Sequence, residues 1–237
     1  MPVMVITGAS AGIGRAVAER ALAAGWQVAG LSRREKAPDG ALAIACDVTD
    51  PRAVETAFDQ VVTELGRIDV LFANAGVFPK SGLIDEIADD DWRQAVAVNL
   101  DGMFFACRAA FARMRAQDPQ GGRIILNGSV SAQAPRPRAA GYTVPKHALS
   151  GLTKQIALDG RAFNIAAGQI DIGNAQTELA DQIGKGVPQA DGSVRAEPMM
   201  PVAEAAEAVL RMADLPAGTN VLQMTIMASA MPLVGRG

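Results

Sequence analysis

The chain has 237 residues, of which 49% are hydrophobic and 20% charged, and its formal net charge is -3. This acidic balance argues against a protein that binds the phosphate backbone of nucleic acid, because such proteins concentrate Lys and Arg on one face. Two cysteines, Cys46 and Cys107, are too few for a disulfide framework. No apolar run approaches the roughly 18 residues of a membrane span, and no leader segment precedes the first strand. We therefore expect a soluble, cytoplasmic protein without a membrane or nucleic-acid partner, built as one domain over residues 1–237.

Short apolar segments alternate along the chain with longer amphipathic segments. This alternation predicts an α/β fold in which a doubly wound parallel sheet carries helices on both faces, giving three layers and about seven strands. The expected strands are 3–7, 27–32, 41–46, 69–73, 123–127, 164–171 and 221–227. The expected helices are 13–24, 51–65, 89–117, 142–158 and 202–214, with a short one at 176–183.

The first strand runs into the segment Thr7-Gly-Ala-Ser-Ala-Gly-Ile-Gly14. Its three glycines allow a tight turn and let a pyrophosphate approach the backbone, while the helix that starts near Ile13 directs its free N–H groups at the phosphates. A glycine pattern that only permits a sharp turn is the alternative, and other motifs must decide between the two.

The end of the second strand bears on the choice of cofactor. An enzyme that uses NAD offers an acid to the ribose hydroxyls at this place, whereas one that uses NADP offers an arginine to the 2′-phosphate. The sequence here is Leu31-Ser32-Arg33-Arg34, which has no acid. Arg33 suits a phosphate through paired hydrogen bonds, so NADP(H) is favoured and NAD(H) is the alternative.

The only tyrosine, Tyr142, precedes Lys146 by four residues. On a helix this spacing places both side chains on one face, so the ammonium group can stabilise a phenolate and bring an acid of pKa about 10 toward neutrality. Pro145 is compatible with that helix if the helix begins near residue 142 or 143, because proline is tolerated in the first turn. The single histidine, His147, cannot build a multi-ligand site, and we predict no metal.

These motifs, with others in a fixed order, resemble the short-chain dehydrogenase/reductase family over nearly the whole chain. The ordered matches are Thr-Gly-x-x-x-Gly-x-Gly at 7–14, Asp47-Val48, Asn74-Ala75-Gly76, Asn99, Ser129, and Tyr-x-x-x-Lys at 142–146. The resemblance implies a Rossmann fold and an oxidoreductase that transfers a hydride between NAD(P) and a carbonyl or alcohol.

The resemblance also implies roles for single residues. Tyr142 is the general acid in reduction and the base in oxidation, Lys146 lowers the tyrosine pKa and binds the nicotinamide ribose, and Ser129 polarises the substrate oxygen. Asn99 holds a water that links Lys146 to solvent, although an asparagine there can also be structural, and Ser131 competes with Ser129. The implied cofactor contacts are Gly8, Ser10, Gly12, Ile13, Gly14, Arg33, Asp47, Val48, Asn74, Ala75, Gly76, Tyr142, Lys146 and Gly168.

The chain departs from the family pattern at Ala167-Gly168, where a Pro-Gly pair usually follows the sixth strand beside the nicotinamide. The connection from Lys146 to Gly168 is also shorter than usual, which predicts an altered loop on the nicotinamide side. We expect a substrate-covering lid at residues 175–200, a region that includes a loosely patterned stretch rich in Gly, Pro and polar residues.

The sequence leaves the substrate open. Four loop cations are candidates to bind a carboxylate: Arg136, Arg138, Lys185 and Arg195. The favoured function is an NADP(H)-dependent carbonyl reductase. The alternatives are an NAD-dependent alcohol dehydrogenase and a non-catalytic, regulatory dinucleotide-binding protein. The family resemblance further implies a homotetramer or a dimer.

Overall fold

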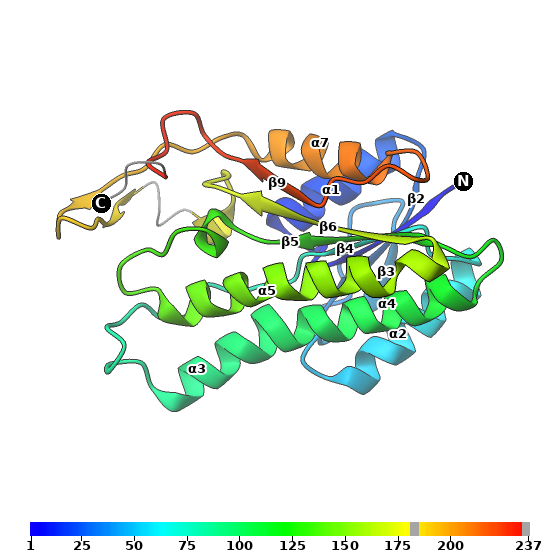
Figure 1. Cartoon of the computed structure of the whole chain (residues 1–237), viewed down its shortest axis with the longest axis horizontal. Coiled ribbons are helices and arrows are strands. Elements are labelled where there is room, and N and C mark those ends of the chain that lie inside the picture. Colours follow the sequence, from blue (N-terminus) through cyan, green and yellow to red (C-terminus); the bar gives the residue numbers. More distant parts are fainter. Residues whose placement is uncertain (181–184, 234–237) are drawn as a thin grey trace.

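The structure, a computed structural model, describes residues 1–180 and 185–233, with strands and helices alternating along the chain (Figure 1). The strands are β1 (Val3–Thr7), β2 (Gln27–Ser32), β3 (Leu42–Ala45), β4 (Val70–Ala73), β5 (Gly122–Asn127), β6 (Ile165–Ile172), β7 (Val187–Pro188), β8 (Val194–Arg195) and β9 (Gln223–Ile226). The α-helices are α1 (Gly12–Ala23), α2 (Pro51–Leu65), α3 (Asp89–Val96), α4 (Gly102–Ala116), α5 (Ala140–Asp159) and α7 (Val202–Ala213). The seven predicted strands of the main sheet are present, with ends that agree to within two residues.

The main sheet has the strand order β3-β2-β1-β4-β5-β6-β9, and every neighbouring pair is parallel. The chain leaves β1 toward β2 and β3, then returns to the other side of β1 with β4. The strand order therefore reverses between β1 and β4, and in such sheets the crevice outside the carboxyl ends of the strands at this point is where ligands bind.

Each face of the sheet carries its own hydrophobic core. Along β1, Val3 and Val5 join one core while Met4 and Ile6 join the other, because successive strand residues point to opposite faces. Helices α1 and α7 cover one face, and α2, α4 and α5 cover the other (Figure 1). Both faces of a parallel sheet are thus buried, and the predicted three-layer α/β fold is confirmed.

Local signals explain why α2 has the bounds that the sequence predicts. The Asp50 side chain accepts a hydrogen bond from the Arg52 backbone N–H (2.8 Å), and Pro51 occupies the first helical position. Gly66 ends the helix in the left-handed conformation (φ 85°), which costs glycine little.

The helix expected over 89–117 is interrupted. Residues Ala97–Asp101 form a π-helical turn between α3 and α4, a feature often found at functional sites. By length and composition alone, the helical run 89–116 is apolar enough to cross a membrane. Its apolar character has a structural explanation, because Met103, Cys107 and Met114 of α4 pack into the core beneath the sheet.

Helix α5 begins at Ala140, two residues before the expected start. Pro145 therefore lies inside the helix rather than in its first turn, and it contributes no N–H to the helical ladder. Tyr142 and Lys146 nevertheless share one face, with the Lys146 Nζ 5.6 Å from the centre of the Tyr142 ring.

The segment after β6 differs from the expected short helix at 176–183. Glu178–Ala180 form one turn of 3₁₀ helix, and residues 181–184 lie outside the described part of the chain. The antiparallel pair β7–β8, which the sequence did not predict, extends from the body of the molecule (Figure 1). Its base is tied to the sheet, because the Met200 N–H donates to the Asn174 carbonyl (2.8 Å) and the Gln176 N–H donates to the Met200 carbonyl (2.9 Å).

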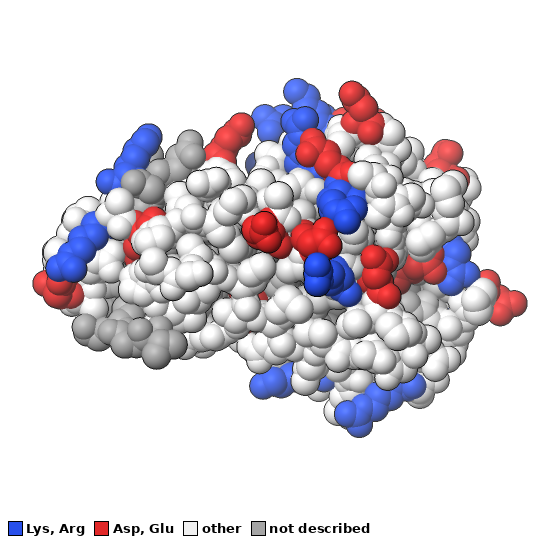
Figure 2. All heavy atoms as spheres, turned by 90° about the horizontal axis from the view of Figure 1, so that it is seen from above, with Lys and Arg blue, Asp and Glu red and all other residues white. Residues whose placement is uncertain are grey.

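Charges of both signs are interspersed on the face formed by α1 and α7 (Figure 2). Arg20 of α1 pairs with Glu207 of α7 (2.8 Å), and Arg15 pairs with Glu19 within α1 (2.8 Å). On this face the basic side chains therefore do not gather into the single-sign surface that nucleic-acid binding needs.

Candidate active site

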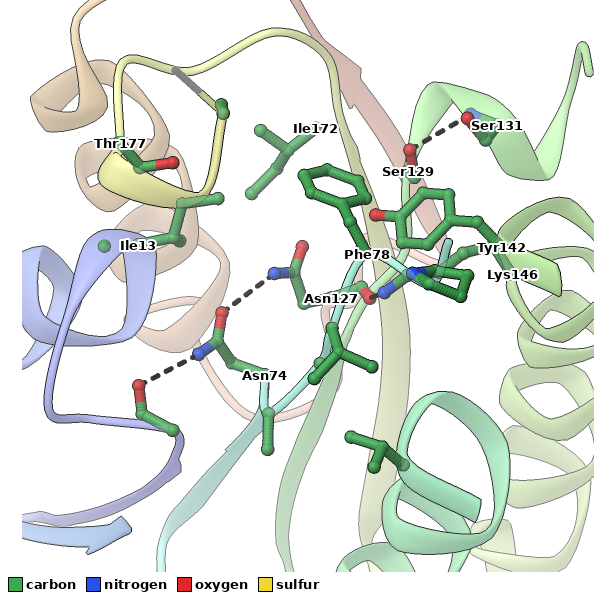
Figure 3. A pocket seen from close by; sticks show the side chains of 18 of the residues that line it. Ile13, Asn74, Phe78, Asn127, Ser129, Ser131, Tyr142, Lys146, Ile172 and Thr177 are labelled. Carbon is green, nitrogen blue, oxygen red and sulfur yellow. Dashed lines mark hydrogen bonds between the residues drawn. The ribbon is translucent and has the colours of Figure 1, made fainter. Parts of the chain in front are cut away.

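A cavity of about 1020 Å³ opens at the carboxyl ends of β1, β4, β5 and β6 (Figure 3). It lies where the strand order reverses. Most of the residues predicted to contact the cofactor line it, namely Gly8, Ser10, Gly12, Ile13, Arg33, Asp47, Val48, Asn74, Ala75, Gly76, Tyr142 and Lys146. Ser129 lines it as well.

The glycine turn after β1 forms one wall of the cavity. Gly8 (φ +71°) and Gly12 (φ +55°) adopt backbone conformations that other residues rarely reach. Gly14 is outside the lining, and a Cβ on it would overlap the Gly8 carbonyl oxygen, so this glycine lets α1 pack against the turn. The N-cap residue is Ala11, whose side chain cannot bond the free N–H groups of α1. Gly12 and Ile13, in the first turn of α1, line the cavity, and these groups fit a pyrophosphate.

A chain of side-chain hydrogen bonds connects the ends of β1, β4 and β5 (Figure 3). The Asn74 Nδ2 donates to the Thr7 carbonyl (2.9 Å), and the Asn127 Nδ2 donates to the Asn74 Oδ1 (2.8 Å). The Lys146 Nζ then donates to the Asn127 carbonyl (2.6 Å). Thr7 and Asn127 were absent from the predicted site, although polar residues at the ends of buried strands are a signal for them.

Asn99 is fully buried in the π-helical turn and lies outside the cavity lining. Its Oδ1 accepts from the Val77 N–H (2.9 Å) and its Nδ2 donates to the Val77 carbonyl (3.0 Å). The side chain therefore holds the loop that follows β4 and forms one cavity wall. Its predicted role in holding a water stays a prediction.

Tyr142 and Ser129 meet inside the cavity, with Phe78 beside them (Figure 3). The Ser129 hydroxyl lies on the Tyr142 side of the cavity, where it favours the ionised form and so lowers the pKa of Tyr142, and its Oγ accepts from the Ser131 N–H (3.1 Å). This position favours Ser129 over Ser131 as the serine of the site. The ring of Phe78 lies 4.7 Å from that of Tyr142, centre to centre.

Burial dominates the proton affinities of the central pair. It raises the pKa of Tyr142 to about 12, against the opposing effects of the Ser129 hydroxyl and the Arg136 charge. It lowers the pKa of Lys146 to about 8, although the Asp171 carboxylate favours the charged form. The pKa of Tyr142 therefore lies above its ordinary value in the protein alone, and the lowering by Lys146 stays a prediction. Tyr142 holds its proton at neutral pH, as a proton donor must.

A buried carboxylate that the sequence analysis missed lies behind Ser129. Asp171 of β6 is fully buried, and its Oδ1 accepts from the Ser129 N–H (3.1 Å) and the Gln169 Nε2 (2.6 Å). Its Oδ2 accepts from the Gln133 Nε2 (2.7 Å) and the Gln223 Nε2 (3.2 Å). Four donors around one carboxylate hold the main chain at Ser129 in place.

The profile of the family described as short chain dehydrogenase matches residues 2–188. The chain belongs to the short-chain dehydrogenase/reductase family. A 3beta-hydroxysteroid dehydrogenase of Mediterraneibacter gnavus is 36% identical over 193 residues, which cover 76% of this chain and 68% of that protein. The 3-oxoacyl-[acyl-carrier-protein] reductase MabA of Mycobacterium avium is 33% identical over 176 residues, covering 74% and 68%.

Solved structures of the family superpose over almost the whole chain. The aldohexose dehydrogenase of Thermoplasma acidophilum has a TM-score of 0.82 at 29% identity and covers 95% of this chain and 92% of its own. A 3-ketoacyl-(acyl-carrier-protein) reductase of Brucella melitensis, complexed with NADH, has a TM-score of 0.84 at 22% identity, with coverage of 97% and 98%. The second likeness supports the Rossmann fold alone.

In this short-chain dehydrogenase, Gly168 does not lie where the sequence predicted a contact with the cofactor. Gly168 lies in the middle of β6 and outside the cavity lining, and a Cβ on it would overlap the Val221 carbonyl oxygen. Gly173 and Asn174 are the first residues after β6 that line the cavity. Gly168 therefore lies inside the strand and is a sheet-packing residue, and the altered loop on the nicotinamide side stays a prediction.

The opposite end of the cavity holds the residues predicted to bind the adenosine. Arg33 and Ser32 line it, while Arg34 does not. The Asp47 Oδ1 accepts from the Thr49 N–H (3.0 Å), which lowers the pKa of Asp47, and the charge of Arg33 lowers it further.

Family membership establishes the general chemistry of the chain. It is an NAD(P)-dependent oxidoreductase that acts on CH–OH or C=O groups of small molecules. A nicotinamide dinucleotide is its cofactor, and the glycine turn with the free N–H groups of α1 fits the pyrophosphate of such a molecule.

Proposed function

We propose that the protein is an NADPH-dependent carbonyl reductase in which Tyr142 donates the proton. The observation that carries this proposal is the protonated Tyr142, which lies beside Ser129 and one helical turn from Lys146 at the wall of the cavity. With its raised pKa, Tyr142 holds at neutral pH the proton that reduction needs. NAD-dependent alcohol oxidation by the same residues in reverse is the second candidate.

When bound along the glycine turn and the wall formed by Tyr142 and Lys146, a nicotinamide dinucleotide would supply the hydride that reduces the carbonyl carbon. The carbonyl π electrons move to oxygen, which takes the proton of the Tyr142 hydroxyl, so that an alcohol and a phenolate remain. Ser129 donates a hydrogen bond to the oxygen as charge develops there, and the Lys146 ammonium stabilises the phenolate. Asn99 does not touch the substrate, but it positions the loop after β4 that forms one cavity wall. We also propose that Asn99 holds a water that links Lys146 to solvent.

The names of two relatives support a substrate whose reacting group is a hydroxyl or an oxo group on a carbon chain or ring. One is named for a 3beta-hydroxysteroid and the other for a 3-oxoacyl group. We take from these names only the class of reacting group, a hydroxyl or an oxo group. The non-catalytic alternative loses its support, because the relatives are named as enzymes and Ser129, Tyr142 and Lys146 are all present.

Arg33 is the residue on which the preference for NADPH depends. We expect Arg33→Ala to weaken NADPH binding by about 10- to 100-fold, since a hydrogen bond between charged groups contributes roughly 1.5–3 kcal/mol. NADH binding should change little. Titration followed by nicotinamide fluorescence measures both, with Arg34→Ala as the control because Arg34 lies outside the cavity lining. Tighter binding of NADH than NADPH by the wild type would instead favour the NAD-dependent alternative.

The lowered pKa of Lys146 predicts the pH dependence of reduction. The ammonium form is populated below its pKa of about 8 and is lost as the pH rises through that value. The rate of carbonyl reduction at saturating NADPH should therefore fall above about pH 8, while Tyr142 is still protonated. Lys146→Arg stays charged, so it should be slower but lack this falling limb. An identical limb in Lys146→Arg would assign the titration to another group.

We also propose a homo-oligomer, a tetramer or a dimer. Trp92, Phe104, Val144 and Leu158, on α3, α4 and α5, are between 37% and 56% exposed, and a second copy of the chain would cover them. Light scattering after size exclusion gives the mass. We further propose that residues 175–200 form a lid over the substrate. The cytoplasmic location stays a prediction.

A further inference from the structure

The half of the cavity around Tyr142 has mainly apolar walls. Phe78 is 43% exposed although its ring packs beside the catalytic tyrosine, so it presents a free aromatic face to the cavity. Further lining comes from Pro79, Val130, Pro137, Val187 and Pro188. A surface of this kind stabilises the apolar part of a ligand.

One cation, Arg136, is partly buried within these walls. Its side chain is 15% exposed, and its charge acts on Tyr142, whose pKa it lowers. Among the loop cations considered from the sequence, Arg136 is therefore the one placed to bind a substrate carboxylate. Arg138 instead pairs with Glu86 (2.7 Å), Arg195 pairs with Asp191 (2.8 Å), and neither lines the cavity.

The charge of Arg136 is matched by a carboxylate from the segment between β8 and α7. The Glu197 side chain is 3% exposed, and its Oε2 lies 2.7 Å from a terminal nitrogen of Arg136. Asn174 joins the pair, since its Oδ1 accepts from Arg136 (2.7 Å) and its Nδ2 donates to the same Glu197 oxygen (2.8 Å). The Gln189 Nε2 donates to the other Glu197 oxygen (3.2 Å).

A substrate carboxylate can bind Arg136 only at an electrostatic cost. It must either displace Glu197 from Arg136, which leaves the buried Glu197 carboxylate without that positive charge, or lie close to the negative charge of Glu197. Lys80 also lines the cavity, but it is exposed, so water and salt screen its charge.

From this charge-matched wall we propose that the site takes a neutral carbonyl substrate with an apolar body, and that Glu197 is the residue that excludes carboxylates. This inference rests on the proposed reductase function and specifies its substrate class. Glu197 acts by neutralising Arg136 and by repelling a second anion, so specificity arises from a repulsive element as well as from the apolar walls.

The test compares a neutral ester with its parent carboxylate, ethyl 3-oxobutanoate with 3-oxobutanoate; the added ethyl group is the same in every variant, so changes in their ratio report the charge. We expect the wild type to have a kcat/KM at least about tenfold higher for the ester. Glu197→Gln, which keeps the shape and removes the charge, should shrink the ester-to-acid ratio by about tenfold or more, through faster reduction of the acid. Asp191→Asn is the control, the same loss of a carboxylate charge at a residue that pairs with Arg195 and not with the cavity residue Arg136, and it should keep the wild-type ratio.

A double variant separates charge from a loosened fold. In Arg136→Met with Glu197→Met both charges are gone, so the preference for the ester should return. A wild type that prefers the acid would overturn the inference, as would a Glu197→Gln ratio equal to that of the wild type.

Binding keeps this inference distinguishable from the proposed function. The dissociation constants of both compounds for the NADP⁺-loaded protein, measured by ligand-observed NMR, should show the same order and the same response to Glu197→Gln. If they do while no carbonyl is reduced, the reductase assignment fails and the charge selectivity stands. Equal affinities for ester and acid in the wild type would contradict the selectivity itself.

Discussion

Tyr142→Phe should lower kcat for carbonyl reduction by about 10²- to 10⁴-fold, the usual contribution of a positioned general acid. The change removes the hydroxyl that gives its proton to the substrate oxygen in the proposed mechanism, while the ring stays beside Phe78. NADPH affinity should stay within about twofold, because the glycine turn and Arg33 are untouched. Loss of NADPH absorbance with a ketone or aldehyde measures the rate, and nicotinamide fluorescence measures the affinity.

Thr143→Val is the control for this experiment. It removes a neighbouring hydroxyl that lies outside the cavity lining and has no hydrogen-bond partner among the described residues. Its rate should equal that of the wild type. If Tyr142→Phe kept more than about a tenth of the activity, another group would be the proton donor.

Asp171→Leu should destabilise the protein by roughly 3–5 kcal/mol, because four donors lose the carboxylate that holds them in a buried place. For a chain of this size, that corresponds to a fall in Tm of about 6–20 °C. The surviving folded fraction should also turn over slowly, since the Ser129 main chain loses its anchor.

Gln223→Leu is the matched comparison for thermal melting. It removes one of the four donors and leaves Asp171 in place, so the expected cost is only about 1 kcal/mol. Equal melting temperatures for Asp171→Leu and the wild type would show that the carboxylate does not support the structure in this way.

Local signals made the fold predictable from the sequence. The strands are short apolar runs, and Asp50-Pro51 marks the start of α2 through a cap that the structure contains. The family motifs also pointed to the cavity, because residues at the carboxyl ends of parallel strands meet at one edge of the sheet. Twelve of the predicted cofactor residues line that cavity, and Gly14 supports it from behind.

The failures concern properties that depend on distant parts of the chain. Gly168 was assigned from the family motif, but it lies inside β6, where it packs against the main chain at Val221. Burial by the whole site raises the Tyr142 pKa, which the helical spacing alone does not reveal. The roles of Asp171 and Glu197 depend on partners that are distant in the sequence. Glu197, for example, pairs with Arg136, which is 61 residues away.

Deuterium transfer is the most direct test of the central claim that this cavity carries out NADPH-dependent carbonyl reduction. The wild type would be mixed with NADPH deuterated at the transferred position and with neutral ketones and aldehydes, and the products weighed by mass spectrometry. We predict an alcohol that carries one deuterium on the former carbonyl carbon, and none from Tyr142→Phe in the same time. Tight NADPH binding with no deuterated alcohol from any of these carbonyls would contradict the account.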